Sequence, residues 1–171
     1  MSDPSHPEPF GDFVQIGVVV RDLDRTINVL SEVFGIGPFR SITYPPANRE
    51  DVETWYMGQS GDFVARLAFA ELGPVELELI QPIEGESIWA DFIREHGEGI
   101  HHIRFNVKDL GKTLNALDEK GITTTQSGSG LRPGTTWAYL DTQSAMGFIV
   151  ELMNPLLGTD GRTPEFTHGD E

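Results

Sequence analysis

The sequence predicts an α+β fold made of two tandem βαβββ modules that together form one cupped, mixed sheet. The first observation behind this prediction is a repeat: residues 20–30 recur at 107–117, and six of the eleven positions are identical. The second is a shorter repeat, in which residues 78–82 recur at 151–155. The third is the order of apolar patterns, which runs strand, helix and then three strands in each copy. Such a repeat indicates a duplicated structural unit.

The first module is expected over residues 11–82, after a flexible arm over 1–10. Asp22 can cap its helix and Gly35 can end that helix, whose apolar positions recur at helical spacing. The residues between the second strand and the third, 45–62, open with two prolines and form an insertion relative to the second module. The expected elements are a strand over 13–20, a helix over 22–34, and strands over 39–44, 63–70 and 75–80.

A helical connector over 83–99, capped by Ser87, is expected to lead into the second module over 100–155. Asp109 can cap the second module's helix, as Asp22 does in the first. We expect residues 128–130 to form a loop and residues 156–171 to form a loose tail. The expected elements are a strand over 100–107, a helix over 109–117, and strands over 122–125, 135–140 and 147–153.

Composition limits the possible functions. The 171 residues carry 12 Lys and Arg against 27 Asp and Glu, a formal net charge of −15, so we expect neither nucleic acid nor a membrane as a partner. The N-terminus is polar and Pro-rich, unlike a signal peptide, and we therefore expect a cytoplasmic protein. Cysteine is absent, so a metal site would have to use imidazole, amide and carboxylate ligands.

Four polar side chains occupy corresponding positions in the two copies. Gln15 and His102 each lie five residues before the Val that opens the longer repeat, while Glu78 and Glu151 open the shorter one. Each lies in an otherwise apolar strand, where a lone polar group is costly unless it is paired or coordinates something. Because one residue per strand can face a shared cavity, the four predict a divalent metal site inside the cup.

The repeat also selects between neighbouring candidates. Glu78 aligns with Glu151, whereas Glu76 aligns with Ile149, so Glu78 is the expected ligand. His101 does not align with Gln15, and strand alternation is expected to point it away from His102. Taken singly, each ligand candidate is better explained as a solvated or core residue, and only their joint symmetry favours a metal site.

Two segments resemble those of a known family. Residues 97–105, Gly-Glu-Gly-Ile-His-His-Ile-Arg-Phe, resemble a segment of methylmalonyl-CoA epimerases, and residues 75–82 resemble their glutamate strand. Over residues 12–155 the chain resembles the vicinal oxygen chelate superfamily, which includes glyoxalase I, these epimerases, extradiol dioxygenases and bleomycin resistance proteins. The resemblance implies metal ligation by the four side chains listed here: Gln15, Glu78, His102 and Glu151. Epimerases usually have His at the first position, whereas a Gln/Glu/His/Glu set is similar to one class of glyoxalase I.

The resemblance implies an enzyme with one divalent ion, Zn, Ni, Co or Mn, that transfers a proton next to a carbonyl through a metal-bound enolate. An isomerase, epimerase or lyase acting on a small molecule is expected, with an acyl-CoA as one candidate substrate and Glu151 as the first candidate base. Two alternatives stay open: a lactoylglutathione lyase of the glyoxalase I type, and a non-catalytic, resistance-type binding protein. An iron dioxygenase is disfavoured, because His102 is the only histidine among the ligand positions.

The insertion is where a second acid or base is expected. Glu50 and Glu53 are the candidates, although a solvated acidic surface run explains them equally well. Trp55 and Tyr56 are expected to line or close the substrate pocket, and Arg104 to contact the substrate. We expect a homodimer, and the sequence leaves open whether the site lies within one chain or between two.

Overall fold

The strands form one curved, mixed sheet in the computed structural model, which describes residues 10–154. Its ten strands follow the order β2-β5-β6-β1-β7-β10-β9-β8-β3-β4. The strands are β1 (Phe13–Val19), β2 (Arg40–Tyr44), β3 (Thr54–Tyr56), β4 (Gln59–Ser60), β5 (Val64–Leu72), β6 (Val75–Glu84), β7 (Gly99–Asn106), β8 (Thr124–Ser129), β9 (Thr136–Leu140) and β10 (Ile149–Asn154). The helices are α1 (Leu23–Phe34), α2 (Ile88–His96), α3 (Leu110–Asp118) and α4 (Gln143–Met146).

The two βαβββ modules lie edge to edge, which confirms the predicted fold class. Their first strands, β1 and β7, are antiparallel neighbours at the centre of the sheet. Each first strand also pairs in parallel with the last strand of its own module, β1 with β6 and β7 with β10. The four strands that carry the predicted ligands are therefore adjacent.

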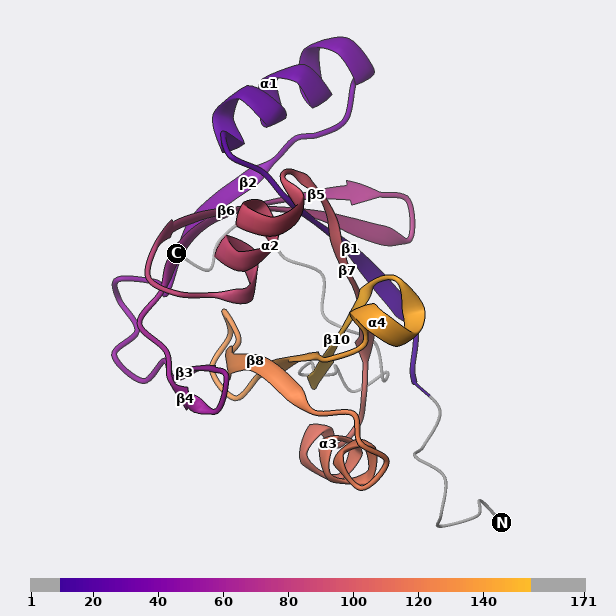
Figure 1. The fold of residues 1–171 in the computed structure, drawn as a ribbon. Coiled ribbons are helices and arrows are strands. Elements are labelled where there is room, and N and C mark those ends of the chain that lie inside the picture. The colour runs from indigo at the N-terminus through magenta and orange to yellow at the C-terminus, as the bar shows by residue number, and fades with distance from the viewer. Residues whose placement is uncertain (1–9, 155–171) are drawn as a thin grey trace.

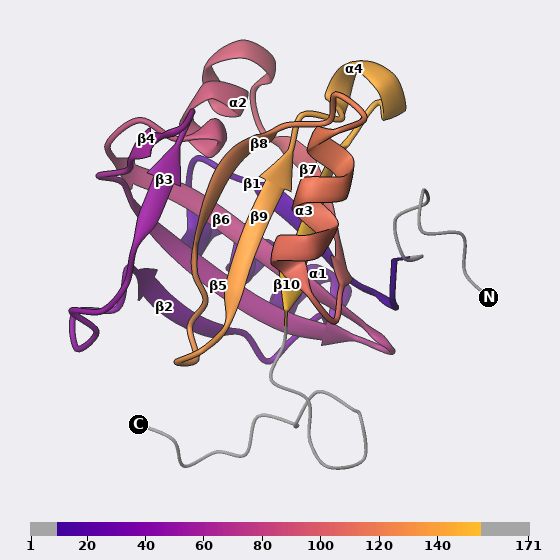
Figure 2. The same cartoon turned by 90° about the horizontal axis from the view of Figure 1, so that it is seen from below.

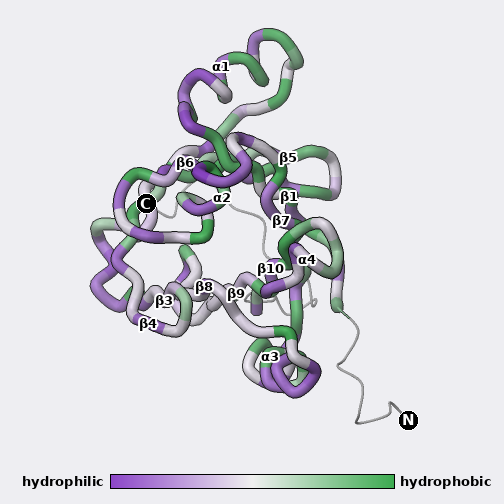
Figure 3. Tube along the Cα trace, viewed as in Figure 1, coloured by the Kyte–Doolittle hydropathy of each residue, from purple (hydrophilic) through white to green (hydrophobic). Residues whose placement is uncertain are grey.

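Helices α1 and α3 cover the outer face of the sheet, on opposite sides of the molecule in Figure 1. Asp22 and Asp109 cap them as expected, each accepting a hydrogen bond from the backbone N–H three residues later. Hydrophobic and hydrophilic segments alternate along α1 (Figure 3), as a helix with one packed face requires. Leu23 of α1 is buried with Leu77 and Leu79 of β6, which makes the outer face of the first module a small core of its own.

A separate core fills the inner face. Helix α2 contributes Trp89 to this core, and the Trp89 side chain is only 3% exposed. Figure 2 shows α2 and the short helix α4, which the sequence did not predict, at the same end of the strands. The core's large aromatic members come from four elements and a loop: Tyr44, Phe63, Phe69, Trp89, Trp137 and Tyr139.

The insertion closes the cup by crossing from one outer edge of the sheet towards the other. It contains β3 and β4, and Trp55 of β3 pairs with Ser127 of β8 in the second module. Arg49 Nη1 donates to the Leu131 carbonyl oxygen at 3.0 Å, and Tyr44 Oη donates to the Ser129 carbonyl oxygen at 2.8 Å. The insertion and the end of β2 therefore join the two modules at a second place, away from the middle of the sheet.

Two local predictions were wrong. The expected loop over 128–130 is largely strand, because Ser129 donates its backbone N–H to the Glu53 carbonyl oxygen of the insertion. Position 128 requires glycine, because the Cβ of any other residue would lie only 2.7 Å from the Trp137 ring. Pro82 does not end its strand, since β6 continues to Glu84.

The predicted tail over 156–171 lies outside the described residues, and so does the predicted arm except for residue 10. Within residues 10–154, no helix is both long and apolar enough to cross a membrane.

Candidate metal centre

The four predicted ligand side chains meet on the inner face of the sheet, within one chain. In one row of cross-strand neighbours, Gln15 pairs with Arg104, which pairs in turn with Glu151. In the next row, Gly17 pairs with both Glu78 and His102. Residues opposite one another on neighbouring strands share a face, so two adjacent rows bring the ligand candidates together.

His102 Nε2 is the point on which the other three side chains converge. It lies 3.1 Å from Glu151 Oε2, 3.4 Å from Glu78 Oε2 and 3.3 Å from Gln15 Oε1. Gln15 and His102 are fully buried, and Glu78 and Glu151 are 7% and 4% exposed. We call these four residues the ligand group.

The electrostatics of the ligand group favour a cation. Burial is the largest cause that raises the pKa of Glu78 above its usual value. Burial by itself would lower the pKa of His102, but the carboxylates of Glu151 and Glu78 outweigh it and raise that pKa to about 9. Two buried carboxylates, an amide oxygen and an imidazole are a donor set that suits Zn, Co, Ni or Mn, so the residues present fit a divalent ion.

A pH effect follows from the pKa of His102. It lies near 9 in the folded protein against 6.5 in the unfolded chain, so its stabilising contribution is complete below pH 6.5 and is lost as pH rises through 9. The raised pKa of Glu78 likewise makes the folded protein less stable as pH rises. We expect the chelator-treated protein to lose on the order of 3 kcal/mol of unfolding free energy over this range. Urea unfolding at several pH values measures it.

Two histidine variants make the pH measurement specific. His102→Gln should remove most of the pH dependence, whereas His96→Gln, which changes an exposed residue of α2, should keep it. An equal slope in wild type and His102→Gln would show that this titration does not govern stability.

Gly17 creates the space for the imidazole. It lies in the middle of β1, and a Cβ built on it would overlap the ring atoms Cε1, Nδ1 and Nε2 of His102. A side chain at position 17 would therefore have to displace the His102 ring. The sequence reasoning missed this residue, because a glycine within a strand gives no sign of which side chain lies over it.

Glu76 fixes the orientation of Gln15. Gln15 Nε2 donates to Glu76 Oε1 at 2.7 Å, which leaves Gln15 Oε1 directed at His102 Nε2. An amide ligand must present its oxygen to a metal, and a carboxylate that holds the NH₂ group selects that orientation. Glu76 does not align with Glu151 in the repeat and was not expected to be a ligand, but it orients the candidate ligand Gln15.

Replacing Glu76 tests this support. We expect Glu76→Ala to weaken divalent metal binding by about 10-fold to 100-fold, because the Gln15 amide is then free to turn. Glu71→Ala is the matched control, since Glu71 is exposed and pairs with Glu76 across β5 and β6. Metal titration followed by calorimetry measures the metal affinity of both variants. Equal affinities in the two variants would contradict the role of Glu76.

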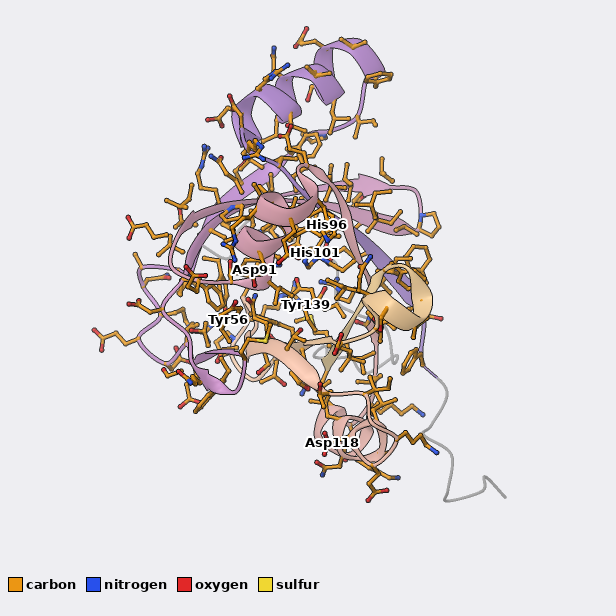
Figure 4. All side chains as sticks on the ribbon, viewed as in Figure 1. Tyr56, Asp91, His96, His101, Asp118 and Tyr139 are labelled. Carbon is orange, nitrogen blue, oxygen red and sulfur yellow. The ribbon has the colours of Figure 1, made fainter. Side chains whose placement is uncertain are left out.

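The expected orientation of His101 was wrong. Gly17 pairs with His102 while Val18 pairs with Ile100, so His101 is the extra residue of a β-bulge. Its side chain is consequently buried next to His102, with the two Nδ1 atoms 3.2 Å apart. Figure 4 shows His101 and Tyr139 together beneath α2. The Tyr139 ring also packs edge-on against His102, with centroids 4.9 Å apart.

The structure does not bring the predicted insertion residues to the ligand group. Glu50 and Glu53 are exposed, and the backbone N–H of Glu53 donates to Ser129 Oγ. Trp55 is 45% exposed. Tyr56 Oη donates to Asp91 Oδ2 of α2 at 2.7 Å, a pair that Figure 4 labels. These contacts hold the insertion against α2 and β8.

Arg104, by contrast, lies beside the ligand group. It stands between Gln15 and Glu151 in the sheet register, and its Nη2 is 3.6 Å from Glu76 Oε1. Among the predicted substrate-binding residues, it is the one that the fold places next to the ligand group.

Comparison with known proteins identifies the family. The sequence profile of the Glyoxalase/Bleomycin resistance protein/Dioxygenase superfamily matches residues 14–139, which include most of both modules. The chain belongs to this superfamily. As in the predicted resemblance, members of the superfamily include enzymes, and the fold described above is consistent with it.

The individual proteins that this chain is similar to are only distantly related to it. The uncharacterized protein YqjC of Bacillus subtilis is 31% identical over 93 residues, 52% of this chain and 64% of YqjC. A 4-hydroxyphenylpyruvate dioxygenase of Legionella pneumophila is 33% identical over 66 residues, 38% of this chain and 19% of the dioxygenase. The methylmalonyl-CoA epimerase of Mycobacterium tuberculosis has a similar fold, with a TM-score of 0.62 at 19% identity, covering 90% of this chain and 95% of the epimerase.

Proposed function

We propose that this protein is a divalent-metal-dependent isomerase or epimerase that transfers a proton next to a carbonyl group. The observation that carries the proposal is the ligand group: three oxygen donors within 3.4 Å of His102 Nε2, buried at the centre of the sheet. Buried charges of this kind are retained where they bind a cation or perform chemistry. Membership of a superfamily that includes metal-dependent enzymes supports the same reading.

Each side chain has a defined part. Gln15, Glu78, His102 and Glu151 would hold the cation, which when bound supplies Lewis-acid stabilisation of negative charge on a substrate carbonyl oxygen. Glu151 would take the acidic α-proton of the substrate. Glu76 holds the Gln15 amide, and the aromatic inner core would keep bulk water away from the reacting carbon.

The placement of the two carboxylates favours epimerisation or isomerisation. Glu78 belongs to the first module and Glu151 to the second, and each lies within 3.4 Å of His102 Nε2. Two carboxylates from different strands can remove a proton from one face of a carbon and return it to the other. The fold similarity to a methylmalonyl-CoA epimerase supports an acyl-CoA as a candidate substrate. A glyoxalase I-type lyase is the alternative that the Gln/Glu/His/Glu donor set favours.

Exchange of the α-hydrogen with solvent deuterium tests the proposal. Protein loaded with Zn, Ni, Co or Mn is incubated in deuterated buffer with acyl-CoA thioesters and with hemithioacetals, and mass spectrometry follows the label. We expect exchange that chelation abolishes. Tight binding of these compounds without any exchange would instead indicate a binding protein of the resistance type.

A further inference from the structure

Three arginines come from separate segments around the inner face of the cup. Arg104 is on β7, Arg40 is on β2, and Arg132 is in the loop between β8 and β9. We call them the arginine cluster. The chain has only 12 basic residues and a net charge of −15, so three cations gathered from three separate segments are notable. Such a local concentration of positive charge attracts anions even on an acidic protein.

Arg104 is the member closest to the ligand group and has unused bonding capacity. Its Nε is buried and has no hydrogen-bond partner within residues 10–154. Its Nη2 lies 3.6 Å from Glu76 Oε1, beyond ordinary hydrogen-bond length. A buried, unsatisfied guanidinium N–H is costly, and a bound anion would satisfy it.

Arg40 is held over the same face. Its guanidinium carbon lies 4.9 Å from the centroid of the Phe69 ring, a cation–π contact. Phe69 pairs with Glu78 of the ligand group, so Arg40 stands two strands away from that carboxylate. Burial lowers the pKa of Arg40, and the nearby charge of Arg132 lowers it further while Glu76 opposes both. Arg132 and Glu76 are thus both within electrostatic range of Arg40.

The arginine cluster lies on the accessible side of the ligand group. Gln15 and His102 are fully buried, whereas the side chains of Arg104 and Glu76 remain 19% and 30% exposed. At the opposite end of the strands, α2 and the aromatic core cover the inner face, and His101 packs against Phe92 of α2. A molecule approaching the ligand group from the exposed end would pass the arginines.

We propose that the arginine cluster binds a carboxylate of the substrate, separate from the carbonyl group that reacts at the ligand group. The substrate class is then a carbonyl compound that bears an additional carboxylate. The planar guanidinium fork of Arg104 matches a carboxylate in two parallel hydrogen bonds, and the other two arginines add charge. Binding the substrate at both ends would fix the orientation of its α-carbon. This inference rests on the proposed function, because it specifies the substrate of the same site.

Matched pairs of α-keto acids test the arginine cluster. Oxaloacetate, α-ketoglutarate and α-ketoadipate each carry a distal carboxylate, and α-ketobutyrate, α-ketovalerate and α-ketocaproate are their counterparts without it. By calorimetry, we expect wild type to prefer the diacid by about tenfold or more at one chain length at least. Arg40→Gln and Arg132→Gln should each reduce that preference several-fold. Arg66→Gln should not, because Arg66 pairs with Asp24 on the outer face.

Three results would overturn the inference. The first is an affinity ratio of diacid to monoacid near one at every chain length. The second is a ratio that stays unchanged in Arg40→Gln and Arg132→Gln. The third is displacement of the diacid by adenosine diphosphate at a lower concentration than by glutarate. The last would assign the cluster to phosphate groups. Metal titration of the same samples keeps the proposed function separate. Metal binding without a diacid preference removes only this inference, and a diacid preference without metal binding removes only the proposed function.

Discussion

Gly17→Ala is expected to weaken metal binding severely by the addition of a single methyl group. The new Cβ would overlap the His102 imidazole, so the ring must leave its position among Gln15, Glu78 and Glu151. We expect the dissociation constant for the divalent ion to rise by about 100-fold or more, because the imidazole ligand is displaced outright. We also expect overpacking to cost about 1–3 kcal/mol of unfolding free energy. Metal titration and urea unfolding measure the two effects.

Gly111→Ala is the control for that substitution. Gly111 is exposed in α3, and a Cβ there would find its nearest atom, Asp109 Oδ1, at 3.8 Å. Alanine should stabilise this helix by up to about 1 kcal/mol and leave metal affinity unchanged. If Gly17→Ala bound metal with an affinity within about twofold of wild type, His102 would not be the ligand that the structure indicates.

Glu151→Gln is expected to have the largest effect on chemistry. The amide keeps the shape and one oxygen donor of the side chain, as Gln15 does in the first module, but it cannot accept the α-proton. At saturating metal, we expect the rate of deuterium exchange to fall by about 10²-fold to 10⁴-fold. Metal affinity should fall much less than in Gly17→Ala, because the amide oxygen still coordinates.

Glu84→Gln is the control for the base, since Glu84 is exposed at the end of β6. It should exchange at the wild-type rate. A Glu151→Gln variant that binds metal and exchanges as fast as wild type would transfer the role of base to another residue, with Glu78 the next to test.

The repeat made the centre of the fold predictable. Duplicated modules must bury a common face, and the strands that begin and end each copy met in the middle of the sheet. Symmetry between the copies therefore paired Gln15 with His102 and Glu78 with Glu151, and the structure brings all four together. That part of the prediction depended only on aligning the two copies of the repeat.

The rest depended on contacts that sequence periodicity does not encode. A bulge in β7 turned His101 towards His102, because strand alternation fails wherever one strand carries an extra residue. The insertion had no counterpart in the second module, so its pairing with β8 could not be inferred from the repeat. Glu76 and Gly17 act only through the side chains that they touch, and both needed the cross-strand register to be noticed.

Metal stoichiometry is the measurement that tests the central claim most directly. Chelator-treated protein is titrated with Zn, Ni, Co and Mn by calorimetry, and bound metal is counted by mass spectrometry in wild type and in a Glu78→Ala/His102→Ala double variant. We predict one tightly bound divalent ion per chain in wild type, for at least one of the four metals, and none in the double variant. Wild-type protein that binds none of the four metals, or a double variant that binds as well as wild type, would contradict a metal centre at Gln15, Glu78, His102 and Glu151.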